Sequence, residues 1–252
     1  MTFWDHLDEL RTVLIRILAV VTVLTVVSFV FKESIFSFVF APKESSFVLY
    51  TLLDRAAHLL GIDGGVSPFS ISLVSTQLAS QFITHMKMSL CTALLLSSPY
   101  MLYQLLRFVT PALYEHERRY AVPVITWGYL LYLIGAAVSY LFVFPLAVRF
   151  LGTYQVSAEV TNLITLDSYI STFVMLTLLM GLMFELPIIC WLFAKMGFIN
   201  APFLCRYRRH AFVIILVVGT VITPTADVFT LLLVSIPIYI LYEASIMVVK
   251  SL

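Results

Sequence analysis

The chain has 252 residues, of which 61% are hydrophobic and 12% are charged, and its mean hydropathy is +1.01. This composition lies far outside the range of soluble domains and excludes a water-soluble enzyme. The 15 basic and 14 acidic residues nearly cancel, which removes the case for a polybasic nucleic-acid-binding protein.

Motifs that would indicate catalysis or a bound cofactor are absent from the sequence. There is no P-loop, no GxSxG elbow and no HExxH pair, so we predict no ATP hydrolysis, no catalytic residues and no cofactor. The three cysteines lack the spacing of a zinc site or of a disulfide framework, and we therefore expect no metal.

Six runs of apolar residues are long enough to cross a membrane, because about 20 residues in a helix span a hydrocarbon core of roughly 30 Å. Backbone groups in lipid must pair within their own segment, so these runs predict an all-α, polytopic membrane protein with six transmembrane helices. We expect residues 1–252 to form a single integral membrane domain. The predicted spans are approximately 12–31, 88–106, 120–148, 168–194, 211–226 and 228–249.

The basic residues predict the orientation of these spans. An even number of spans places both termini on one side, and ten of the 15 basic residues fall on that side. They are Arg11, Arg16, Arg107, Arg118, Arg119, Lys195, Arg206, Arg208, Arg209 and Lys250. By the positive-inside rule, both termini are predicted to be cytoplasmic, which leaves residues 32–86 as one large extracytoplasmic loop.

This loop contains two predicted helical stretches. Over 47–60, apolar residues recur at helical spacing, which indicates an amphipathic helix whose apolar face packs over the membrane domain. That face comprises Leu49, Leu52, Leu53, Ala56 and Leu60. A helical pattern resumes near Leu78 and is expected to run into the second span.

Two carboxyl groups are left inside predicted spans. A charged group at the centre of a membrane helix costs about 2.5 to 3.5 kcal/mol on insertion scales, so Glu185 is expected to face protein or a water-filled groove. Two interpretations stay open for it: a protonated structural residue or a member of a polar groove. Pro187 is expected to kink the helix beside it, and Glu243, near the end of the last span, is expected to be structural. Six prolines in or beside five spans favour a concave assembly.

Acidic residues also lie beside predicted spans on the cytoplasmic side. The N-terminal stretch carries Asp8 and Glu9 on a short interfacial helix, and the loop after the second span carries Glu115 and Glu117 after an apolar, aromatic stretch. Carboxylates at a membrane surface suit bidentate pairing with arginines of a partner.

A series of short motifs resembles TatC, the multi-spanning subunit of the twin-arginine protein translocase. The resemblance covers nearly the whole chain, in order and at matching spacings. Its motifs are HLDELR at 6–11, Pro99, YQ at 103–104, Phe108 with PALY at 111–114, HERR at 116–119, Phe142 with PL at 145–146, FELP at 184–187, TP at 223–224, Asp227, IP at 236–237 and YE at 242–243.

The resemblance implies a concave, glove-like fold and a receptor for twin-arginine signal peptides. Such a receptor works with single-span TatA and TatB subunits, associates with itself in a receptor complex and moves folded proteins across the bacterial plasma membrane by the proton-motive force. The implied signal-peptide surface comprises Glu9, Leu10, Arg11, Phe108 and Glu117.

Two further roles are implied by the resemblance, and two rival functions remain. Glu185 becomes the membrane-embedded acid inside the concave face, and Asp227 marks the outer turn between spans five and six. Because an embedded carboxyl invites a hydrogen-bonding partner, we expect Glu185 to contact TatA or TatB helices. The first rival is a secondary transporter of a small polar solute that uses Glu185 with Glu243, although no internal repeat supports it. The second rival is a purely structural scaffold.

Overall fold

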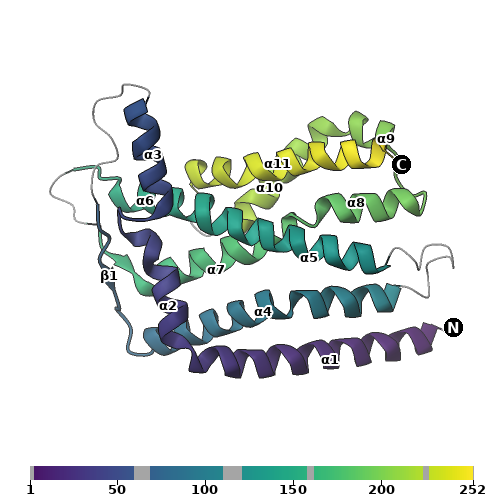
Figure 1. The fold of residues 1–252 in the computed structure, drawn as a ribbon, viewed down its shortest axis with the longest axis horizontal. Coiled ribbons are helices and arrows are strands. Elements are labelled where there is room, and N and C mark those ends of the chain that lie inside the picture. Colours follow the sequence, from purple (N-terminus) through teal and green to yellow (C-terminus); the bar gives the residue numbers. More distant parts are fainter. Residues whose placement is uncertain (1–2, 60–68, 110–120, 158–161, 224–226, 252) are drawn as a thin grey trace.

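The structure, a computed structural model, describes residues 3–59, 69–109, 121–157, 162–223 and 227–251. Long helices lie side by side with alternating direction, while the short helices α2 and α3 lie across one end of them (Figure 1). The elements are α1 (Phe3–Val30), α2 (Lys32–Phe40), η1 (Ala41–Lys43), α3 (Val48–Leu59), β1 (Leu73–Val74), α4 (Ser80–Val109), α5 (Ala121–Val138), the π-helix η4 (Ser139–Val143), α6 (Phe144–Thr153), β2 (Ile164–Thr165), α7 (Leu166–Met183), α8 (Leu186–Lys195), α9 (Ala201–Arg206), α10 (Arg208–Ile222) and α11 (Val228–Lys250).

Four helical segments in the described part of the chain are long and apolar enough to cross a membrane. They are Leu7–Val30, Pro123–Thr153, Leu166–Lys195 and Val228–Lys250. Helices α4 and α10 run beside them in the bundle, so the prediction of an all-α protein is confirmed (Figure 1). The start of α1 and the end of α11 lie at the same end of the bundle (Figure 1).

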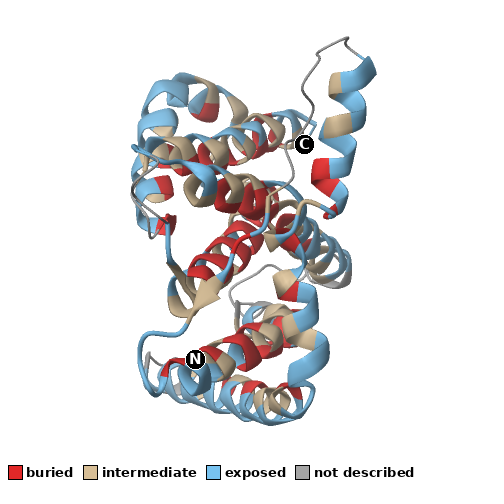
Figure 2. Cartoon of the chain, turned by 90° about the vertical axis from the view of Figure 1, so that its left-hand side faces the viewer, coloured by how far each residue is buried: buried red, intermediate tan, exposed pale blue. Residues whose placement is uncertain are grey.

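The core centres on α7, which is packed on several sides by other helices. Leu176 and Met180 of α7 are fully buried, as are Phe144 of α6 and Val234 of α11. Seen from the end that carries α2 and α3, buried residues lie on the faces where helices meet, and the outward faces are exposed (Figure 2). Exposed apolar faces suit contact with lipid, where no hydrophobic force drives them together.

Helix α3 is the amphipathic helix predicted over 47–60, but a different face of it packs on the membrane helices. Leu49 of the predicted face is buried, whereas Leu52 and Leu53 are 52% and 38% exposed, so that prediction is wrong in part. Tyr50 decides the orientation instead. Its hydroxyl, which is buried, donates to the carbonyl oxygen of Pro145 at 2.8 Å.

The surroundings of Tyr50 keep this hydroxyl protonated. Burial raises its pKa above the usual range of a tyrosine, and the Arg149 guanidinium beside the ring opposes the rise. A second carbonyl oxygen, that of Pro42, lies 3.1 Å from the hydroxyl. One side chain therefore ties α3 both to η1 and to the start of α6.

Replacing Tyr50 with phenylalanine should lower the free energy of unfolding by about 1 to 2 kcal/mol, because the buried hydroxyl that donates to the Pro145 carbonyl oxygen is lost. Thermal unfolding of the purified protein in detergent measures this change. The matched control is Tyr154→Phe, since Tyr154 lies at the same end but is 61% exposed. Equal stability of the two variants would contradict the assignment to Tyr50.

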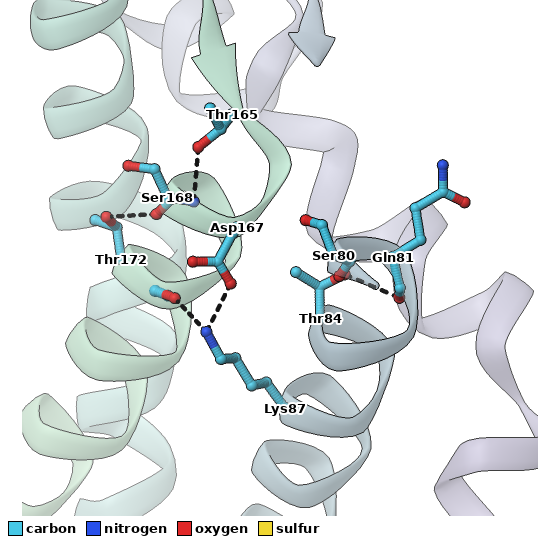
Figure 3. Close-up of polar contacts among 9 residues, drawn as sticks. Ser80, Gln81, Thr84, Lys87, Thr165, Asp167, Ser168 and Thr172 are labelled. Atoms are coloured by element: carbon cyan, nitrogen blue, oxygen red, sulfur yellow. Dashed lines mark hydrogen bonds and ion pairs between the residues drawn. The ribbon is translucent and has the colours of Figure 1, made fainter. Parts of the chain in front are cut away.

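Polar contacts join α4 to α7 near the end that carries α2 (Figure 3). The Lys87 ammonium donates to Asp167 Oδ1 at 2.6 Å and to Ser171 Oγ at 3.0 Å. Thr165 Oγ1 caps α7 by accepting from the backbone N–H of Ser168 at 3.3 Å. Because both charged groups of the ion pair are more than a third exposed, the pair sets the register of the two helices more than it adds stability.

Candidate functional site

Four residues expected on the signal-peptide surface lie at one end of an antiparallel helix pair. Helices α1 and α4 contact each other extensively, and the start of α1 lies beside the end of α4 (Figure 1). Glu9, Leu10 and Arg11 lie in the first turns of α1, and Phe108 is the second-last residue of α4. The fold therefore brings two distant parts of the sequence to the same end of the bundle.

This end presents both polar and apolar groups. Leu10 and Phe108 are half-buried, whereas Arg11 is exposed. Glu9 is half-buried, and its Oε2 accepts no hydrogen bond from a described residue. A carboxylate with an unused oxygen can accept a charge-assisted hydrogen bond from a guanidinium. Glu117, the other expected carboxylate, lies outside the described residues.

The span predicted over 168–194 is interrupted at Glu185. Helix α7 ends at Met183 and α8 begins at Leu186, because Pro187 has no N–H to continue the α-helical pattern. The backbone N–H of Glu185 donates to the carbonyl oxygen of Leu182 at 3.1 Å, a three-residue turn tighter than an α-helix. The kink expected at Pro187 is therefore a break between two helices.

The Glu185 side chain is buried at this break. It is 5% exposed, and its Oε1 has no hydrogen-bond partner among the described residues. A pocket of about 250 Å³ lies beside it, lined mainly by leucines of α4 and α7 together with Ser98 and Tyr132. An unpaired carboxyl beside an apolar pocket is energetically costly, so a hydrogen-bond donor that enters the pocket would stabilise it.

Three glycines that the sequence interpretation missed allow the helices to approach around Glu185. A Cβ at Gly128 would lie 3.1 Å from Glu185 Oε2. A Cβ at Gly135 would lie 2.7 Å from the carbonyl oxygen of Met180, and one at Gly181 would lie 2.8 Å from the ring of Tyr132. Gly128 and Gly135 are seven residues apart and so share one face of α5, a spacing that the sequence alone displays.

Gly135→Ala should destabilise the protein by about 1 to 3 kcal/mol, since the added methyl group collides with backbone of α7 and forces the helices apart. The measurement is thermal unfolding in detergent. Ala137→Val adds bulk to an exposed position of the same helix and should leave stability unchanged. A Gly135→Ala variant as stable as the control would show that the approach of α5 and α7 is not tight.

The second embedded carboxyl, Glu243, has partners in the structure. Its Oε2 accepts from the Arg208 guanidinium at 2.8 Å, and its Oε1 accepts from the Tyr239 hydroxyl at 3.3 Å. This pairing agrees with the structural role expected for Glu243 and ties α10 to α11.

Asp227 lies at the opposite end of α11 from the C-terminus. Its Oδ1 accepts from the backbone N–H of Thr230 at 2.7 Å, which caps the helix. Residues 224–226 of the predicted outer turn lie outside the described residues. Within the described chain, no cluster of three or more histidine, cysteine or acidic side chains could hold a metal ion.

Comparison with known proteins identifies the family. The family model for Sec-independent protein translocase protein (TatC) matches residues 5–237. The chain belongs to the TatC family. The TatC protein of Escherichia coli K12 is 34% identical over 246 residues, which cover 96% of this chain and 85% of that protein. The TatC protein of Blattabacterium from Periplaneta americana is 31% identical, with 98% and 94% covered.

Solved structures of the family have the same fold. A crystal structure described as the twin-arginine translocase receptor TatC matches with a TM-score of 0.78 at 32% identity and covers 98% of both chains. A second, described as the same receptor in DDM, matches with a TM-score of 0.80 at 31% identity and covers 97% of this chain and 99% of that one. The expected six-helix, glove-like TatC arrangement is thus confirmed.

Family membership also decides between the functions inferred from sequence. The chain is a component of the Sec-independent protein translocase and a membrane protein, and its family is not a family of enzymes. The comparisons give no support to a secondary transporter of small solutes.

Proposed function

We propose that this TatC chain is a receptor for twin-arginine signal peptides and that the shared end of α1 and α4 binds the arginine pair. The observation that carries the proposal is that Glu9, Leu10 and Arg11 of α1 lie at the same end of the helix pair as Phe108 of α4. Glu117 follows eight residues after α4 ends and joins the same surface in the proposal.

The chemistry of this end suits an arginine pair. The planar guanidinium presents a fork of donors that matches a carboxylate, and Glu9 has an oxygen that no described residue uses. Half-buried Leu10 and Phe108 supply apolar contacts next to the acid. The apolar segment of a signal peptide would then continue along the membrane helices.

Glu185 and its pocket form the second element of the proposal. A single-span subunit of the TatA or TatB type would place a polar side chain against the unused Oε1 and apolar side chains against the leucines of the pocket. With these partners, and in a receptor complex that contains further copies of itself, the chain would move folded proteins by the proton-motive force.

The proposed orientation follows from charge. Ten of the 15 basic residues belong to the side that holds both termini, which supports a cytoplasmic position for this side and for the α1–α4 site. The membrane in the proposal is the inner membrane of a bacterial cell. Residues 1–252 would form one membrane domain whose loop over 32–86, with α2 and α3, lies outside.

Photo-crosslinking tests where the signal peptide binds. A photoreactive phenylalanine analogue at Leu10 or Phe108 should crosslink a peptide that carries the arginine pair and should lose most of the product when lysines replace both arginines. The matched control position is Leu59, which is 88% exposed on α3 at the other end of the bundle. Crosslinks of equal yield from Leu59, or yields that do not depend on the arginine pair, would refute the proposed position of the signal-peptide site.

A further inference from the structure

A second pocket, of about 570 Å³, lies at the other end of the bundle from the α1–α4 site. It is lined by residues along the whole length of α2, by the first turns of α4 and by Leu166 at the start of α7. Phe36 and Phe40 of α2 and Phe82 of α4 line it with aromatic rings. Because α2 follows directly on α1, the pocket lies beside the end of a helix that is long and apolar enough to cross a membrane.

The polar groups of this pocket carry both signs of charge. Lys32 and Glu33, in the first turn of α2, both line it and are both exposed. Within the described chain, neither forms an ion pair that the structure records. Phe31, which precedes α2, provides no side-chain cap for the first N–H groups of the helix. A helix start with a lysine is favourable for a phosphate group.

A buried histidine nitrogen without a hydrogen-bond partner is a second observation that points to a ligand in this pocket. The His85 ring stacks on Phe29 with centroids 3.8 Å apart and meets Phe36 edge-on. Its Nε2 is buried and has no hydrogen-bond partner among the described residues, although His85 lines the pocket. The neighbouring Gln81 side chain projects away from the Lys87–Asp167 pair and is exposed (Figure 3). Both groups can bond to a polar headgroup.

An apolar surface continues from the pocket along the membrane helices. Val27 and Val30 of α1 are 46% and 74% exposed, and Phe82 and Met86 of α4 are 61% and 48% exposed. Phe82 lines the pocket, and Met86 lies one turn further along the same face of α4, in the direction that the acyl chains of a lipid would take. A small soluble ligand would make no use of this surface.

We propose that this pocket binds the headgroup of a phospholipid that carries a phosphate and a primary ammonium. Lys32 and the start of α2 hold the phosphate, and the Glu33 carboxylate accepts from the ammonium. Gln81 and His85 complete the contacts from α4. A lipid with only a negative headgroup would leave Glu33 unpaired, and a trimethylated ammonium has no N–H to donate.

Native mass spectrometry of the purified full-length protein, delipidated and titrated with defined lipids, tests the proposal. The probes are phosphatidylethanolamine, phosphatidylcholine and phosphatidylglycerol with the same acyl chains. The wild-type protein should bind the ethanolamine lipid about fivefold more tightly than either other lipid, as expected for one half-solvated ion pair. Equal binding of the three lipids would overturn the proposal.

Two variants assign the roles of the charged groups. Glu33→Gln should abolish the preference for the ethanolamine lipid and leave the binding of the other two unchanged, whereas Lys32→Gln should weaken all three about fivefold. Glu44→Gln and Arg55→Gln remove the same charges elsewhere at this end and should alter nothing. Retention of the preference in Glu33→Gln would overturn the assignment, and unchanged binding of the other lipids shows that the variant is folded.

Discussion

Replacing Glu117 with glutamine is expected to weaken the binding of a twin-arginine signal peptide by about 10- to 100-fold while the protein still inserts into the membrane. The reason is the loss of one charge-assisted bond to a guanidinium, which contributes about 1.5 to 3 kcal/mol. Fluorescence anisotropy of a labelled signal peptide with the purified protein measures the change. Glu9→Gln should also weaken binding, since Glu9 has an oxygen that no described residue uses.

Glu115 provides the matched control, because it lies two residues from Glu117 in the same loop and carries the same charge. Glu115→Gln should leave affinity within about twofold of wild type. A peptide with two lysines should bind the wild-type protein weakly and should lose little more affinity in Glu117→Gln. Equal losses in the Glu115 and Glu117 variants would mean that only the net charge of the loop matters.

The second large effect is expected at Glu185. Glu185→Leu should reduce export of a folded twin-arginine reporter about tenfold or more, because the pocket between α4, α5 and α7 loses its carboxyl group and with it the proposed bond to a partner helix. Glu185→Gln keeps a group that donates and accepts and should retain most of the export. Cysteine crosslinking of single-span subunits to α4 and α5 should fall in parallel with export.

Glu243→Gln separates this role from a general need for embedded acids. Glu243 already pairs with Arg208, so we expect its replacement to affect stability more than export. The Glu185 proposal fails if Glu185→Leu exports the reporter as well as wild type, or if the single-span subunits crosslink only to faces distant from the pocket.

Much of the fold could be predicted from the sequence, because lipid imposes long apolar helices. The runs of apolar residues predicted six helices, and the structure contains them, including the short α10 of 15 residues. Pro187 indicated the break beside Glu185 because a missing N–H acts locally. The motifs from HLDELR onward indicated the TatC family, since several short patterns in fixed order are far more specific than any one of them.

Features that depend on contacts between distant residues could not be predicted in the same way. The packed face of α3 is set by the bond from Tyr50 to Pro145, 95 residues away, and periodicity alone favoured the leucines instead. The pairing of β1 with β2 involves only two residues from each strand, too few to give a pattern. Lys87 and Asp167 are 80 residues apart in the sequence, so their ion pair depends on the packing of α4 against α7.

In the candidate site, too, some features could be predicted from the sequence and others depend on how the helices pack. Glu185 stood out because an acid in an apolar span is costly, but the glycines that let α5 approach it had no distinguishing chemistry. Glu9 and Phe108 were matched to the family by short motifs, and only the antiparallel packing of α1 on α4 explains why they lie at one end.

The most direct test of the account is export in cells that lack their own TatC subunit. With this chain supplied, a folded reporter that carries a twin-arginine signal peptide should reach the far side of the membrane, and a reporter with two lysines should remain in the cytoplasm. Collapse of the proton gradient should stop export. Insertion of the chain without any export of the arginine reporter, or equal export of both reporters, would contradict the proposed receptor function.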